Sequence, residues 1–145
     1  NMMRGRLVGI DYGTKRVGIA IADPFRMFSQ PVGTYSQDEA LLILDRINAE
    51  NWISSIVIGW PLEEDGKAGP ATVRVQQYVN RLKKRFKKAE IILQDERYTT
   101  QSAKEMIKEG ARPSLKKTGR ARIDTAAAGI ILQEYLEDTD STLPS

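Results

Sequence analysis

Three acidic residues have the types and positions that a catalytic site would need. Asp11 ends a short apolar run, Glu96 directly follows another, and Asp124 lies at the start of the last helix-forming segment. If the three converge, their repulsion raises the pKa of at least one carboxyl group unless a cation neutralises the cluster. Mg²⁺ or Mn²⁺ suits such oxygen ligands. Two such ions about 4 Å apart activate water and stabilise the leaving oxygen of a phosphodiester.

Each acid also has a purely structural explanation. Asp11 could support its own turn through an Asx-type hydrogen bond. Glu96 could pair with the adjacent Arg97, and Asp124 could be favoured by the helix macrodipole. Taken singly, a functional role is favoured for Asp11, a structural role is favoured for Asp124, and Glu96 is undecided. Only the set of three points to chemistry.

The amino-acid composition removes several other kinds of site. The 145 residues include no Cys and no His, which excludes disulfides, thiolate zinc sites and Ser-His-Asp triads. A hydrophobic fraction of 41% and a charged fraction of 28% are typical of globular proteins. We expect one domain over residues 1–145, with 139–145 as a frayed tail. Neither a membrane span nor a signal peptide is visible, so the expected location is the cytoplasm.

Positive charge is concentrated in one part of the chain. The net charge is only +3, yet Arg81 to Arg122 contains fourteen basic and five acidic residues. Such a segment is typical of a polyanion binder, although a solvated helix face explains the charge equally well. For the cluster Arg81–Lys88 the solvated face is favoured, because apolar residues at helical spacing predict the opposite face as core. The basic residues that precede Asp124 are better candidates for phosphate contact.

The turn after Asp11 offers a second possible phosphate site. Gly13, Thr14 and Lys15 could cradle phosphates with backbone amides, or could form an ordinary turn. The candidate nucleic-acid contacts are therefore Lys15, Arg97, Lys116, Lys117, Arg120 and Arg122.

The elements that must position these residues follow from hydrophobic spacing and turn signals. Strands are predicted near residues 6–11, 16–23, 28–35, 54–59 and 90–95, and helices near 36–50, 70–86, 99–110 and 123–137, with a basic loop over 111–119. A hairpin followed by alternating strands and helices predicts an α/β fold with a five-stranded mixed sheet, strand 2 antiparallel, and helices on both faces. Ligands of such sheets bind beyond the carboxyl ends of the parallel strands.

Four segments resemble a known family in their order along the chain: GIDYGTKRVGIAIAD, IVIGWPLEEDG, LQDERYTT and RIDTAAAGIILQEYL. They are similar to the motifs of the YqgF/RuvX family of Holliday-junction resolvases or pre-16S ribosomal RNA nucleases, which have a ribonuclease-H-like fold. The resemblance spans Gly9 to Leu136. One departure is Glu63, where the family often has Asn, so the amide donor of that position is missing.

The resemblance implies a metal-dependent nuclease in which Asp11, Glu96 and Asp124 are the acidic triad. It also implies Mg²⁺ or Mn²⁺, two ions in the active complex, and a flexible, substrate-facing loop before Asp124. The expected substrate is branched DNA or precursor rRNA, cleaved by a monomer or weak homodimer without membrane contact.

Two other functions remain open from the sequence. A non-catalytic nucleic-acid module would keep the fold without the activity. An actin-like or sugar-kinase-type phosphate-binding domain would use GIDYGT as its phosphate hairpin, but those enzymes close two such domains over a nucleotide and this chain supplies one.

Overall fold

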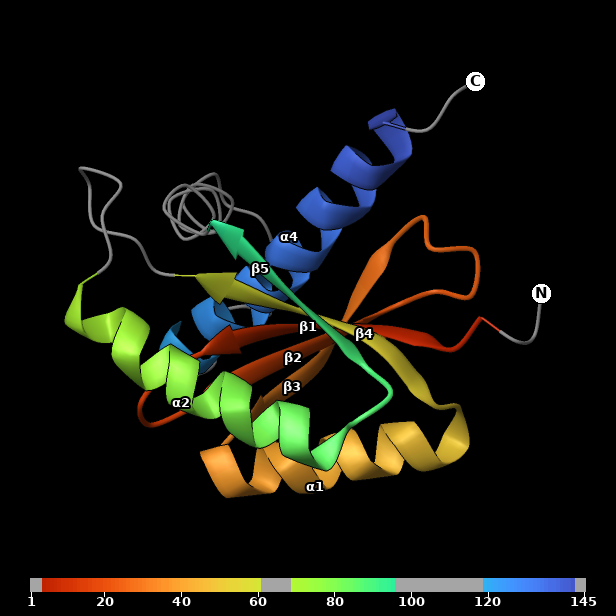
Figure 1. The fold of residues 1–145 in the computed structure, drawn as a ribbon. Coiled ribbons are helices and arrows are strands. Elements are labelled where there is room, and N and C mark those ends of the chain that lie inside the picture. Colours follow the sequence, from red (N-terminus) through yellow and green to blue (C-terminus); the bar gives the residue numbers. More distant parts are fainter. Residues whose placement is uncertain (1–3, 61–68, 96–118, 143–145) are drawn as a thin grey trace.

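The computed structural model describes residues 4–60, 69–95 and 119–142, which form a twisted sheet covered by helices (Figure 1). The strands are β1 (Arg6–Tyr12), β2 (Val17–Ala22), β3 (Ser29–Tyr35), β4 (Ile53–Trp60) and β5 (Glu90–Asp95). The helices in these ranges are α1 (Gln37–Glu50), α2 (Pro70–Arg85) and α4 (Gly119–Thr142).

The sheet is mixed and has the strand order β3-β2-β1-β4-β5. β2 is antiparallel to β1 and to β3, whereas β1, β4 and β5 run parallel to one another. The predicted five-stranded mixed sheet with an antiparallel second strand is confirmed. Because β1, β4 and β5 are parallel, their carboxyl ends lie at one end of the sheet, where ligands of α/β proteins bind.

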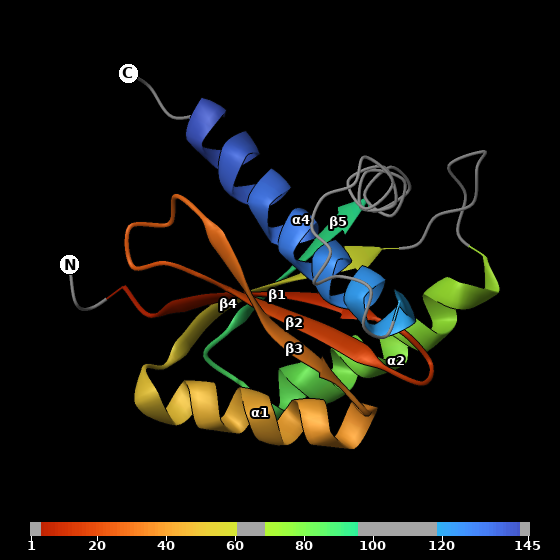
Figure 2. The same cartoon turned by 180° about the vertical axis from the view of Figure 1, so that it is seen from behind.

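Helices cover both faces of the sheet: α1 and α2 lie on one face and α4 lies on the other (Figures 1 and 2). Side chains alternate between the faces along each strand. Val8 and Ile10 therefore pack in the core beneath α1 and α2, while Leu7 packs in the core beneath α4.

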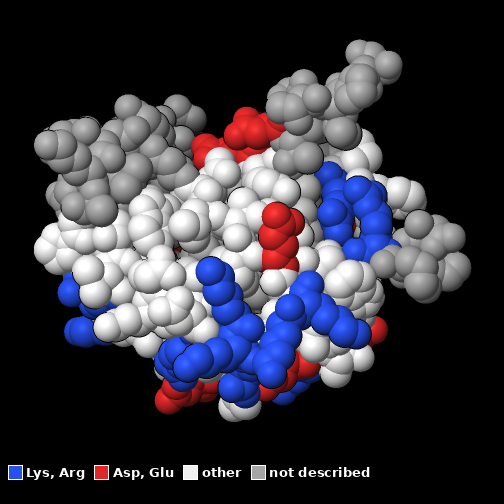
Figure 3. Space-filling view, in the orientation of Figure 1, with Lys and Arg blue, Asp and Glu red and all other residues white. Residues whose placement is uncertain are grey.

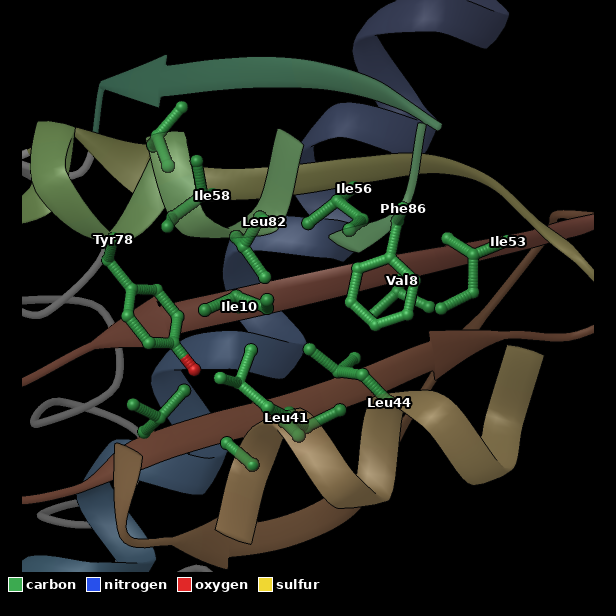
Figure 4. Close-up of a cluster of buried hydrophobic side chains, with 14 of the residues drawn as sticks. Val8, Ile10, Leu41, Leu44, Ile53, Ile56, Ile58, Tyr78, Leu82 and Phe86 are labelled. Carbon is green, nitrogen blue, oxygen red and sulfur yellow. The ribbon is translucent and has the colours of Figure 1, made fainter. Parts of the chain in front are cut away.

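The larger core lies between the sheet and the α1–α2 layer (Figure 4). The predicted apolar stripe of α2 is buried there from Val75 to Phe86. At the start of the helix, however, Thr72 is buried rather than Ala71. Burial of the Thr72 hydroxyl is tolerated because Oγ1 donates a hydrogen bond to the Gly69 carbonyl at 2.6 Å, and buried polar groups need such partners.

Local signals set the boundaries of α1. Ser36 Oγ accepts from the Glu39 N–H, and Glu39 Oε1 accepts from the Ser36 N–H, so the predicted capping box is present. Two donors that a helix start leaves unpaired are thereby satisfied.

The last helix is longer than predicted at both ends. It begins at Gly119 and ends at Thr142, whereas the sequence pattern predicted residues 123–137. Residues 139–142, which were predicted as part of a frayed tail, are therefore helical. Arg120 and Arg122 are consequently part of a helix and not of a loop, which corrects the prediction. Arg and Ala have high helix propensity, so the turn before the apolar stretch is helical as well.

The predicted helix near 99–110 lies outside the described residues, and so does the predicted basic loop over 111–119 except for Gly119, which begins α4. In residues 4–60, 69–95 and 119–142, no helix is long and apolar enough to cross a membrane.

Candidate functional site

Asp11 lies near the carboxyl end of β1, opposite Gly18 of β2. Its position in the alternation places it on the same face as Leu7 and Gly9, which is the face that α4 covers. Its side chain is half-buried. The strand thus presents Asp11 beside α4 at the end of the sheet where ligands bind.

The parallel strands place two further positions level with Asp11. Ile10 pairs with Ile58 in β4, and Ile58 pairs with Leu93 in β5. The residues that follow these are Asp11 in β1, Gly59 in β4 and Gln94 in β5, so these three positions are level with one another. Neighbouring strands are about 4.8 Å apart, so the β1 and β5 backbones are separated by about 10 Å at this level. Glu96 lies outside the described residues; in sequence it follows Asp95, the last residue of β5.

Close packing of α4 on β1 determines how near the helix lies to the strand that carries Asp11. A Cβ atom on Gly9 would lie 2.7 Å from Leu132 Cβ and 3.1 Å from the Ala128 carbonyl oxygen. Only glycine therefore allows the helix this close to the strand. Figures 1 and 2 both show the first turns of α4 on the side of the sheet where β1 ends. Asp124 precedes Ala128 by four residues, about one helical turn.

The turn after Asp11 is held by the start of α1. Gln37 Nε2 donates to Tyr12 Oη at 3.0 Å and to the carbonyl oxygens of Thr14 at 2.8 Å and Gly13 at 3.4 Å. Lys15, at the exposed side of this turn, is therefore carried by a backbone with a defined conformation. Nothing in the sequence pattern pointed to Gln37, because its partners lie more than twenty residues earlier in the chain.

The buried side chain of Tyr78 supports the backbone of Gln37. Tyr78 Oη donates to the Gln37 carbonyl at 3.2 Å, and the Tyr78 ring centre lies 5.1 Å from that of Tyr12. Burial raises the pKa of Tyr78 to about 12, because a low-polarity environment disfavours the phenolate. Tyr78 consequently stays a neutral hydrogen-bond donor at physiological pH and has a structural role.

The structure therefore describes part of the predicted site. Asp11 and Lys15 have described side chains; Asp124, Arg120 and Arg122 are placed by the α4 backbone alone; Glu96, Arg97, Lys116 and Lys117 lie outside the described residues. Among the described side chains, no group of three His, Cys, Asp or Glu residues gathers as a metal site. The convergence of the three acids accordingly stays a prediction.

The strand order β3-β2-β1-β4-β5, with β2 antiparallel and helices on both faces, is that of a ribonuclease-H-like fold. Two solved structures share the fold. A Fowlpox virus resolvase in complex with Holliday junction DNA superimposes with a TM-score of 0.57 at 14% identity, over 92% of this chain and 98% of the resolvase. RuvC of T. thermophilus, in complex with a Holliday junction substrate, gives 0.55 at 12% identity, over 96% and 98%. At such identities the likeness concerns the fold alone.

Sequence comparison identifies the family. Residues 5–138 match the RuvX family, which is described as "Holliday junction resolvase", and the chain belongs to that family. A relative from Salinibacter ruber is 46% identical over 92% of this chain and 94% of its own length. Another, from Chlorobaculum tepidum, is 35% identical over 91% and 93%. Both carry the name "Putative pre-16S rRNA nuclease".

Proposed function

We propose that this protein is a metal-dependent endonuclease that hydrolyses phosphodiester bonds in structured nucleic acid. The observation that carries the proposal is the position of Asp11. It lies near the carboxyl end of β1, on the face covered by α4, level with the next-to-last residues of two parallel strands. The family description and the names of the relatives support the same class of reaction.

The acidic triad of the proposal is Asp11, Glu96 and Asp124. Asp11 lies within β1, Glu96 directly follows β5 in the sequence, and Asp124 belongs to the first turns of α4. A backbone separation of about 10 Å between β1 and β5 leaves room for two carboxylates to reach toward a shared centre. Carboxylates without His or Cys suit Mg²⁺ or Mn²⁺. Such a cation, when bound, activates water and stabilises the leaving oxygen of the phosphodiester.

The remaining steps belong to side chains and backbone of this chain. Lys15, on the turn anchored by Gln37, contacts a phosphate next to the scissile bond. Arg97, Lys116 and Lys117, together with Arg120 and Arg122 at the start of α4, neutralise further phosphates. These cations position the substrate without reading bases, because contacts to phosphate oxygens carry no sequence information.

A cleavage panel tests the proposal and selects the substrate class. The purified protein is incubated with a four-way DNA junction, duplex DNA and a 16S rRNA precursor, each with Mg²⁺, Mn²⁺ or EDTA. We expect cleavage of the junction or the precursor with either cation and none with EDTA. Cleavage of the precursor alone assigns rRNA processing, and symmetric cleavage of the junction assigns resolution. Binding without cleavage of any substrate would favour a non-catalytic nucleic-acid module instead.

A further inference from the structure

A basic pocket lies at the opposite end of the sheet from Asp11. Its volume is about 310 Å³, at the lower end of the range for ligand pockets. It lies between the carboxyl-terminal ends of α1 and α2 and the first residue of β4. Its lining comprises Asn48, Trp52, Ile53, Phe86 and Ala89 together with Lys84, Arg85, Lys87 and Lys88.

Three of the four cations in this lining are available to a ligand. Arg85 forms an ion pair with Asp45: Arg85 Nη2 and Nε lie 2.6 Å and 3.0 Å from the Asp45 carboxylate oxygens. Lys84, Lys87 and Lys88 are exposed, and they have no ion-pair partner among the described residues. Figure 3 shows Lys and Arg gathered in this region, near the end of α2. Such a cluster attracts phosphate groups.

Trp52 gives the pocket an aromatic wall. Part of its ring lies against Gly5, where an added Cβ would be 2.8 Å from Trp52 Cε2. The residue nevertheless stays 40% exposed, so part of the ring is open to a ligand. A tryptophan beside lysines is the combination with which proteins hold single strands, since bases stack on the ring and phosphates contact the cations.

Asn48 adds a hydrogen-bond donor. Its Oδ1 accepts from the Ile53 N–H at 2.8 Å, which fixes the orientation of the amide. The Nδ2 group is then left as a donor for a phosphate or base oxygen.

We infer that this pocket binds a single-stranded nucleic-acid segment, with one base stacked on Trp52 and its phosphates on Lys84, Lys87 and Lys88. The inference rests on the proposed function, which supplies the nucleic acid. From Ile53 in the pocket to Gly59, level with Asp11, β4 extends about 20 Å. A substrate that contacts both sites is therefore extended, so the pocket holds an arm or an unpaired end distant from the cleaved bond.

The lysines also have a structural explanation. Lys84 lies in the last turn of α2, where positive charge stabilises the helix macrodipole. Lys87 and Lys88 follow the helix and make the same kind of contribution. Under that explanation alone, their removal lowers stability and leaves nucleic-acid binding unchanged.

Trp52 fluorescence provides a direct test. The chain has two tryptophans, so Trp60→Phe leaves Trp52 as the only reporter. A 5′-phosphorylated dinucleotide of adenylate, too short to reach Asp11 from the pocket, is titrated in EDTA at low salt. We expect saturable quenching of Trp52. Because the readout is binding without metal, a failure of the cleavage panel leaves this test intact.

Charge variants made in the Trp60→Phe protein distinguish binding in the pocket from general electrostatic attraction. Lys87→Ala/Lys88→Ala is compared with Arg74→Ala/Lys83→Ala, which removes two exposed α2 charges outside the lining. The pocket pair should weaken binding roughly tenfold. On a longer single strand it should flatten the slope of log affinity against log salt by about 1.4, at 0.7 per lost contact. Trp52→Leu should weaken binding of that longer strand, measured by fluorescence anisotropy, without changing the slope.

Three results would overturn the inference. One is the absence of quenching in the Trp60→Phe protein. Another is an equal loss of affinity in the pocket pair and the control pair, with equal melting temperatures. The third is equal quenching by a poly-glutamate peptide, which would assign the pocket to an acidic protein partner.

Discussion

At the scale of single residues, Asp11 is the group on which the proposed chemistry depends most. Asp11→Asn keeps the shape of the side chain and its hydrogen-bonding capacity but removes the charge that holds a cation. We expect cleavage to be lost while the protein stays folded. The melting temperature in EDTA should stay level or rise, because clustered carboxylates repel one another. A large drop in that temperature would show that Asp11 is structural instead.

Gln37 belongs to the same scale, but it acts by positioning the turn that carries Lys15. Gln37→Ala removes the donor shared by Tyr12, Gly13 and Thr14. The free energy of unfolding should fall by about 1 kcal/mol. KM should rise severalfold with a smaller change in kcat, because substrate contact is affected more than the acids.

The matched control for Gln37 is Gln76→Ala in α2. Gln76 Nε2 donates to Asn80 Oδ1 at 3.0 Å on an exposed surface, so one amide contact is lost there too. Wild-type KM is expected for this control. If Gln37→Ala also retained the wild-type KM, the turn would have no part in substrate binding.

At the scale of elements, the contact between β1 and α4 determines the geometry of the site. Gly9→Ala introduces a Cβ into the closest approach of the two elements. Overpacking of this kind costs about 1–3 kcal/mol, or roughly 3–10 °C in Tm for a chain of this length. Cleavage should fall as well, because α4 carries Asp124 away from β1.

Gly129→Ala, in α4 itself, is the control for this prediction. There the added Cβ would lie 3.6 Å from Ser29 Oγ, an ordinary van der Waals contact. We expect the free energy of unfolding to stay level or rise by up to about 1 kcal/mol, because alanine favours a helix more than glycine does, and cleavage to stay normal. A Gly9→Ala protein with wild-type Tm and activity would contradict the packing described for α4.

The elements also show what sequence patterns can and cannot predict. Short apolar runs predicted β1, β4 and β5, alternation of apolar residues predicted β2, and the Ser36–Glu39 spacing predicted the start of α1, since these signals are local. The approach of Gly9 to Ala128 joins residues more than a hundred positions apart, and no periodicity encodes it. The predicted start of α4 was wrong because the residues just before the apolar stretch have high helix propensity. The helix therefore begins earlier and includes Arg120 and Arg122.

The sequence predicted which residues form the candidate site, but not how their side chains lie relative to one another. Asp11 could be placed because a strand end and a turn are both local features. The side chains of Glu96 and Asp124 depend on segments whose placement no local pattern fixes. Their assignment to one centre therefore came from the resemblance to a family, which the match over residues 5–138 confirms as a family assignment.

At the scale of the whole molecule, charge is expected to guide the substrate to both ends of the sheet. Lys116 and Lys117 precede α4 in the sequence and should contact phosphates around the scissile bond. Lys116→Ala/Lys117→Ala should weaken duplex binding similarly across sequences, and the slope of log affinity against log salt should flatten by about 0.9 per lost contact. Turnover of bound substrate should fall less than affinity, because the three acids are unchanged. Unchanged affinity and slope would move the main binding surface to the basic cluster Arg81–Lys88.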